Sequence, residues 1–105
     1  MIVKSKDSNH REFKGVNFEV LAVGKDAMLT KMNFKKGQIV PLHSHPNEQC
    51  GYVISGKHRI TIVNEETILN CGDSYSIPKN VNHSWEVLEE GVIIDFFTPP
   101  RADYS

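Results

Sequence analysis

The sequence predicts a single all-β domain, folded as a sandwich or a barrel. Helical patterns are scarce, because no stretch keeps apolar residues at helical spacing between a capping residue and a glycine stop. Short segments rich in β-branched and aromatic residues instead recur every eight to twelve residues. Turn formers such as Gly, Pro, Asn and Asp separate these segments. Together, these observations favour many short strands over a helical or mixed fold.

Eight segments have the composition of strands, and several of them alternate apolar and polar residues. They are residues 17–23, 27–34, 38–45, 49–55, 58–64, 66–70, 83–88 and 91–97. A further short strand is expected between the turn at Gly72-Asp73 and the turn at Pro78. The residues expected in the core are Phe34, Ile39, Val53, Ile54 and Ile94.

The chain has the length of one domain, which we place at residues 1–105. Residues 1–12 are mostly polar and are expected to be loosely held. Residues 98–105, TPPRADYS, form a proline-rich C-terminal tail. This tail cannot continue a central strand, because proline supplies no backbone donor to the sheet.

Charge and hydropathy exclude several classes of partner. The net charge is −1 and the basic residues are dispersed, so the chain has no footprint for nucleic acid. Its apolar runs are too short to span a membrane, and its first residues lack the apolar core of a secretory signal. We therefore expect a cytoplasmic protein. Cys50 and Cys71 are expected to be buried, reduced thiols, although a bond between them stays open.

A His-x-His pair lies in the segment HSHPNEQCGYVISG, residues 43–56. Alternate residues of a strand face the same side, so His43 and His45 share a face. The same parity places Gln49 in phase with them and Glu48 out of phase. A bulge at Pro46 would reverse this choice, so either Glu48 or Gln49 remains a candidate ligand.

A third imidazole is available downstream at His83, after a further strand and a proline turn. Two histidines on one strand and one on a neighbouring strand suit a divalent first-row metal with open coordination positions. The identity of the metal stays open among Ni, Zn, Mn, Fe and Co, because affinity order and cellular supply compete.

These residues resemble the two motifs of the cupin superfamily. Gly37, His43-x-His45, Gln49 and Gly56 match the first motif, and Gly72, Pro78 and His83 match the second. The resemblance implies a small jelly-roll β-barrel that holds a metal through His43, His45, Gln49 and His83. The chain departs from the common pattern at three positions, since Gln49, Asn80 and Val87 stand where glutamate, glycine and asparagine are usual. Asn80 is tolerable because asparagine adopts left-handed backbone angles readily.

A narrower resemblance extends along nearly the whole chain. HSHPNEQ, GDSYSIPKNVNH and the tail DFFTPPRADY look like the KdgF-like cupins of pectin degradation. That family handles unsaturated uronate monosaccharides and promotes their opening to linear keto-uronates. The resemblance implies that Asp95 is the acid/base, that Arg101 binds the substrate carboxylate and that Phe97 shapes the pocket.

The residues themselves leave alternatives for each of these roles. Asp95 is in phase with Phe97, so it is either a proton-transfer group or a buried acid with backbone or arginine partners. Arg101 is either a bidentate carboxylate ligand or an exposed tail residue. Trp85, in phase with His83, either stacks on a sugar ring or fills the core. His58 either lines the core with a polar partner or donates a proton in the pocket.

The favoured function is therefore that of a metal-dependent enzyme acting on a small unsaturated uronate. The alternatives are another metal-dependent cupin enzyme, such as an iron dioxygenase or a sugar isomerase, and a non-catalytic sugar-binding cupin. An open sheet edge also favours pairing of two chains, so we expect a homodimer.

Overall fold

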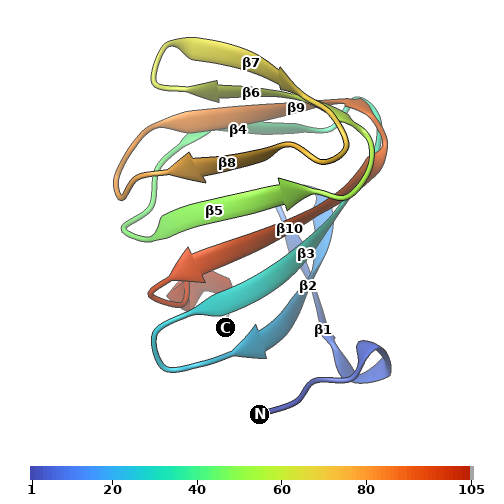
Figure 1. Ribbon diagram of the computed structural model, residues 1–105, viewed down its shortest axis with the longest axis vertical. Coiled ribbons are helices and arrows are strands. Elements are labelled where there is room, and N and C mark those ends of the chain that lie inside the picture. The colour runs from blue at the N-terminus through green and yellow to red at the C-terminus, as the bar shows by residue number, and fades with distance from the viewer. Residues whose placement is uncertain (105) are drawn as a thin grey trace.

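Two antiparallel sheets form the structure, a computed structural model that describes residues 1–104 (Figure 1). The larger sheet has the order β1 (Asn9–Phe13), β2 (Val16–Val23), β3 (Met28–Phe34), β10 (Gly91–Thr98), β5 (Glu48–Val53) and β8 (Ser74–Ile77). The smaller sheet has the order β4 (Ile39–His43), β9 (His83–Glu89), β6 (Lys57–Ile62) and β7 (Glu65–Leu69). Two short 3₁₀ turns, Ser5–Asp7 and Ala102–Tyr104, are the only helical elements among residues 1–104. The predicted all-β fold is confirmed.

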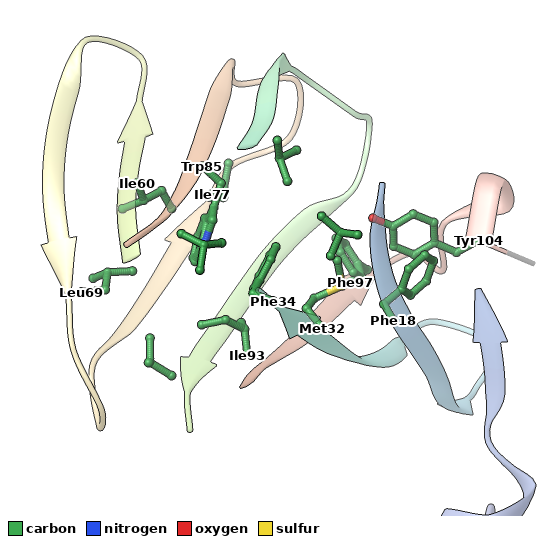
Figure 2. Close-up of a cluster of buried hydrophobic side chains, with 14 of the residues drawn as sticks. Phe18, Met32, Phe34, Ile60, Leu69, Ile77, Trp85, Ile93, Phe97 and Tyr104 are labelled. Carbon is green, nitrogen blue, oxygen red and sulfur yellow. The ribbon is translucent and has the colours of Figure 1, made fainter. Parts of the chain in front are cut away.

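Strict alternation along the strands places the core between the sheets. In β3, every second residue from Met28 to Phe34 is buried, and its neighbours are half-buried. Strand β9 alternates in the same way from His83 to Val87. Figure 2 shows the resulting cluster, which continues from Ile60 and Leu69 through Phe34 and Ile93 to Phe18 and Tyr104. The alternation that predicted strands from the sequence is thus the pattern that builds the core.

Several expectations from the sequence are wrong in detail. The predicted strand 38–45 ends at His43, because residues 44–47 form a loop. Ile39 and Ile54 are 60% and 45% exposed and Ile94 is only half-buried, on the outer face of its sheet, although we expected all three in the core. Val53 is the last residue of β5 and Ile54 follows it directly. Successive side chains point to opposite faces of a sheet, so only one of the two can face inward. Cys50 and Cys71 are free thiols, as expected, but both are exposed rather than buried.

The two ends of the chain are more ordered than their composition suggests. Residues 9–13, inside the polar segment, form the edge strand β1 and pair with β2. Strand composition did not predict β1, because its side chains are mostly polar and exposed. At the other end, the tail turns back so that Arg101 and Tyr104 are buried. Ser105, the last residue of the predicted tail, lies outside the described residues. No helix in residues 1–104 is long and apolar enough to cross a membrane.

His58 on β6 is a fully buried core histidine with two polar partners. Its Nε2–H donates to the carbonyl of Ser55 at 3.1 Å, and its Nδ1 accepts from the indole N–H of Trp85 at 3.1 Å. These bonds use both ring nitrogens of the neutral imidazole. Burial lowers the pKa of His58, and the bond to Ser55 opposes this shift. His58 therefore takes up a proton less readily in the folded chain than in the unfolded chain.

We expect His58 to make the metal-free protein less stable as the pH falls. Below about pH 6.5, where an unfolded histidine is protonated, the unfolded chain binds the extra proton and is stabilised relative to the folded chain. The free energy of unfolding should therefore decrease between about pH 7 and pH 5, and the decrease should be smaller in His58→Gln. Guanidinium unfolding at the two pH values measures this difference. Equal decreases in both proteins would contradict the assignment.

Candidate metal centre and pocket

Three histidines converge at one end of the space between the sheets. His43 ends β4 and His83 begins β9, and the two residues pair directly across the strands. His45 enters from the loop that leads to β5. One nitrogen from each ring lies within 4.8 Å of the corresponding nitrogens of the other two rings. His45 and His83 are buried, and His43 is half-buried. The structure thus brings together the three imidazoles that the sequence predicted.

Each of these rings is fixed by a backbone carbonyl. The Nδ1 atoms of His43, His45 and His83 lie 2.9, 3.0 and 2.8 Å from carbonyl oxygens, which can only accept. The carbonyls belong to Pro41, Asn47 and Val81. Each Nδ1 therefore carries the proton, and each Nε2 keeps its lone pair for a ligand. This tautomer leaves the Nε2 of each ring free to bind a metal.

Gln49 adds a fourth polar atom beside the rings. It is 8% exposed, and its Oε1 lies 3.1 Å from Nε2 of His45. With the proton of His45 on Nδ1, both facing atoms carry lone pairs. A cation near both of them would turn this repulsion into attraction. The donor set therefore fits a divalent metal, while Glu48 is exposed and points away.

The electrostatic surroundings keep the three imidazoles neutral. Burial lowers the pKa of His43 and of His45, and the positive charge of Arg101 lowers both further. Burial, followed by the proximity of the His43 and His45 imidazoles and the charge of Arg101, lowers the pKa of His83 to about 4. Neutral imidazole is the form that binds a metal. At neutral pH the Nε2 atoms of the three histidines are therefore already unprotonated and available to a metal.

Asp95 lies on β10, opposite Gly51 of β5, and is 4% exposed. The hydroxyl of Tyr75 donates to its Oδ1, and the side-chain amide of Gln49 donates to the same carboxyl group. Burial raises the pKa of Asp95 to about 6, although these hydrogen bonds and the charge of Arg101 oppose the shift. A carboxyl group with this pKa can take up and release a proton near neutral pH.

Arg101 is buried, with 4% exposure, and is not the exposed tail residue that was the alternative. Its Nε and one terminal nitrogen donate to the two carboxylate oxygens of Asp103 at 3.1 and 2.6 Å. Its other terminal nitrogen donates to the hydroxyl of Tyr104 at 2.9 Å. The guanidinium also lies over the rings of Phe13, Phe97 and Tyr104. These contacts fix both the position and the plane of the cation.

A cavity of about 40 Å³, open to the surface on one side, joins these groups. Its polar lining consists of His43, Gln49, Tyr75, His83, Asp95 and Arg101. Phe97 and Trp85 contribute to its apolar wall. Trp85 also stacks on Phe34 and donates its indole N–H to His58, so it is both part of the pocket wall and part of the core. A site of this kind, mostly apolar with a few converging polar groups, suits a small polar ligand.

A model of the cupin domain matches residues 30–97 of the chain. The chain belongs to the cupin family. It is 38% identical over 92 residues to the pectin degradation protein KdgF of Dickeya dadantii (strain 3937), over 86% of this chain and 84% of that protein. The predicted likeness to KdgF-like cupins is therefore confirmed.

Solved cupin structures share the complete fold. An RmlC-like cupin from Shewanella frigidimarina NCIMB 400 superposes with a TM-score of 0.91 at 26% identity, over 99% of this chain and 95% of that chain. KdgF from Halomonas sp. superposes with a TM-score of 0.90 at 25% identity, over 100% of this chain and 98% of that chain. Both matches extend over the tail as well as the two cupin motifs.

The unusual motif residues of this cupin have clear local reasons. Asn80 adopts a φ of +62°, the left-handed conformation for which glycine is usual. Val87 is 1% exposed and belongs to the core. Analysis of the sequence missed Tyr75, Asp103 and Tyr104, which contact Asp95 or Arg101. The sequence did offer one signal for Tyr75: it lies two residues before the apolar Ile77 on β8, so the two side chains face the same side of the strand.

Proposed function

We propose that this cupin is an enzyme of pectin degradation that acts on unsaturated uronate monosaccharides. It would promote opening of the ring and its conversion to a linear keto-uronate. One observation carries the proposal: a buried carboxyl group and a buried guanidinium line the same pocket as His43 and His83, two of the three clustered histidines. The 38% identity to a pectin degradation protein indicates the class of substrate.

Each polar or aromatic residue of the pocket has a separate role in this proposal. Arg101 pairs with the uronate carboxylate, and Asp103 and Tyr104 hold its guanidinium in place for this contact. Asp95 accepts and returns the proton that ring opening and keto formation require, since its pKa of about 6 suits both directions near neutrality. Phe97 and Trp85 form apolar walls that orient the sugar ring. A divalent metal held by His43, His45, Gln49 and His83 would supply a Lewis acid that polarises substrate oxygens.

The test is a turnover assay on an unsaturated galacturonate, followed by the loss of its ultraviolet absorbance. We expect the absorbance to fall faster with the metal-loaded protein than in buffer, and to return to the buffer rate after chelation. A decay no faster than in buffer would overturn the proposal. If the sugar nevertheless bound, the chain would be assigned as a sugar-binding cupin.

We also propose that the chain forms a homodimer through the outer face of the larger sheet. Phe96 and Ile54 are 42% and 45% exposed there, and Ile94 and Leu29 lie beside them on the same face. Several exposed apolar side chains on one sheet face favour association. Gel filtration with light scattering should give a dimer for the wild type and a monomer for Phe96→Lys. Leu42→Lys, which changes an exposed leucine of β4, should remain dimeric. A monomeric wild type would contradict the proposal.

A further inference from the structure

A row of three residues crosses the inner face of the larger sheet beside the pocket. Strand β5 pairs with β8 on one side and with β10 on the other. The register places Gly51 opposite Tyr75 on β8 and opposite Asp95 on β10. Tyr75 nevertheless donates its hydroxyl hydrogen to Oδ1 of Asp95, two strands away. The tyrosine side chain therefore passes over Gly51 to reach the carboxyl group.

Gly51 provides the space for this contact. A Cβ atom at this position would lie 2.1 Å from Cζ and 2.2 Å from the hydroxyl oxygen of Tyr75, and 2.6 Å from Oδ1 of Asp95. Its backbone is that of an ordinary strand residue, so no unusual φ angle explains the glycine. Close approach of a neighbouring side chain is the remaining reason for glycine inside a strand.

Gln49 is joined to the same network from the next inward position of β5. Its side-chain amide lowers the pKa of both Asp95 and Tyr75 through hydrogen bonding, which places the nitrogen end of the amide toward these two groups. The oxygen end faces His45, 3.1 Å away. A free amide could present either end to the histidines. The contacts with Tyr75 and Asp95 thus decide which atom of Gln49 is offered at the metal centre.

We propose that Tyr75 is a positioning residue of this site, which aims the Asp95 carboxyl group and orients the Gln49 amide by reaching across Gly51. Tyr75 need not touch the substrate for this role, since it acts through its two partners. The part that concerns Asp95 rests on the proposed function. The part that concerns Gln49 rests only on the donor set of the metal centre.

The decisive variant is Tyr75→Phe, which keeps the ring and removes the hydroxyl group. We expect kcat to fall about 10-fold or more with KM changed less than about twofold, because positioning of the acid/base is lost and the carboxylate contact is kept. Titration of the apo-protein with Zn²⁺ should show an affinity about 10-fold weaker, the size of effect typical of residues that orient metal ligands. Tyr52→Phe is the matched control, because Tyr52 is 48% exposed on the outer face of β5. It should leave all three quantities unchanged.

The zinc titration separates this inference from the proposed function. A wild type without turnover would remove the proposed function, and the affinity ratio of wild type to Tyr75→Phe would still decide the role of Tyr75. Gly51→Ala is the second variant and should reproduce the loss of zinc affinity, because the added methyl group displaces Tyr75. Wild-type zinc affinity and kcat in Tyr75→Phe would overturn the proposal. Wild-type zinc affinity in Gly51→Ala would overturn the role of Gly51.

Discussion

Replacement of His83 by alanine should reduce metal affinity at least about 100-fold, equivalent to about 2.7 kcal/mol. The expected loss exceeds that for a residue that only orients a ligand, because His83→Ala removes a donor atom itself. His83 is 4% exposed and its Nδ1 is held by the Val81 carbonyl, so its Nε2 has a fixed position that an alanine side chain cannot supply. Calorimetric titration of the apo-protein with Zn²⁺ and elemental analysis of the purified protein measure the change. Turnover of the unsaturated uronate should fall to the buffer rate.

His58→Gln is the matched control for this experiment. His58 is also buried, but Trp85 and Ser55 occupy both of its ring nitrogens. Its removal should alter stability and leave zinc affinity close to the wild-type value. If His83→Ala bound zinc as tightly as the wild type, the three histidines would not form a metal centre. Equal losses in both variants would mean that the effect comes from the fold rather than from the ligand.

The sequence was sufficient for those parts of the site that depend on strand parity. Asp95, Phe97 and His83 lie on regular strands, so their inward direction follows from period-two alternation. Gln49 was also placed correctly inside, but the continuous strand assumed for it does not exist. A loop separates β4 from β5, and Gln49 faces inward because of its pairing with Ile77 of β8 and Phe97 of β10.

The contacts between distant segments could not be predicted from the sequence. Nothing local indicates that Tyr75 reaches across Gly51, because that contact depends on the order of three strands. The burial of Arg101 was equally hidden, since it requires the tail to return to the aromatic rings of Phe13 and Phe97. A polar sequence such as PPRADY has no periodic pattern from which such docking follows.

Asp95→Asn should lower kcat on the unsaturated uronate by about 100- to 10,000-fold and leave KM within a few fold of the wild-type value. The amide has nearly the same shape and can still accept the hydrogen bond from Tyr75. It cannot accept and return a proton near neutral pH. An effect on kcat with little effect on KM is therefore what loss of a proton-transfer group predicts.

Two comparisons make this expectation specific to the Asp95 carboxyl group. Asp26→Asn changes an exposed aspartate in the turn between β2 and β3, and should keep the wild-type kcat. Zinc titration of Asp95→Asn shows whether the metal centre survives the substitution, since Asp95 is also a partner of Gln49. A variant that binds zinc normally but has lost kcat assigns the proton transfer to Asp95. A variant that keeps the wild-type kcat would rule out that role, and the buried carboxyl group would then serve only to hold Tyr75 and Gln49 in place.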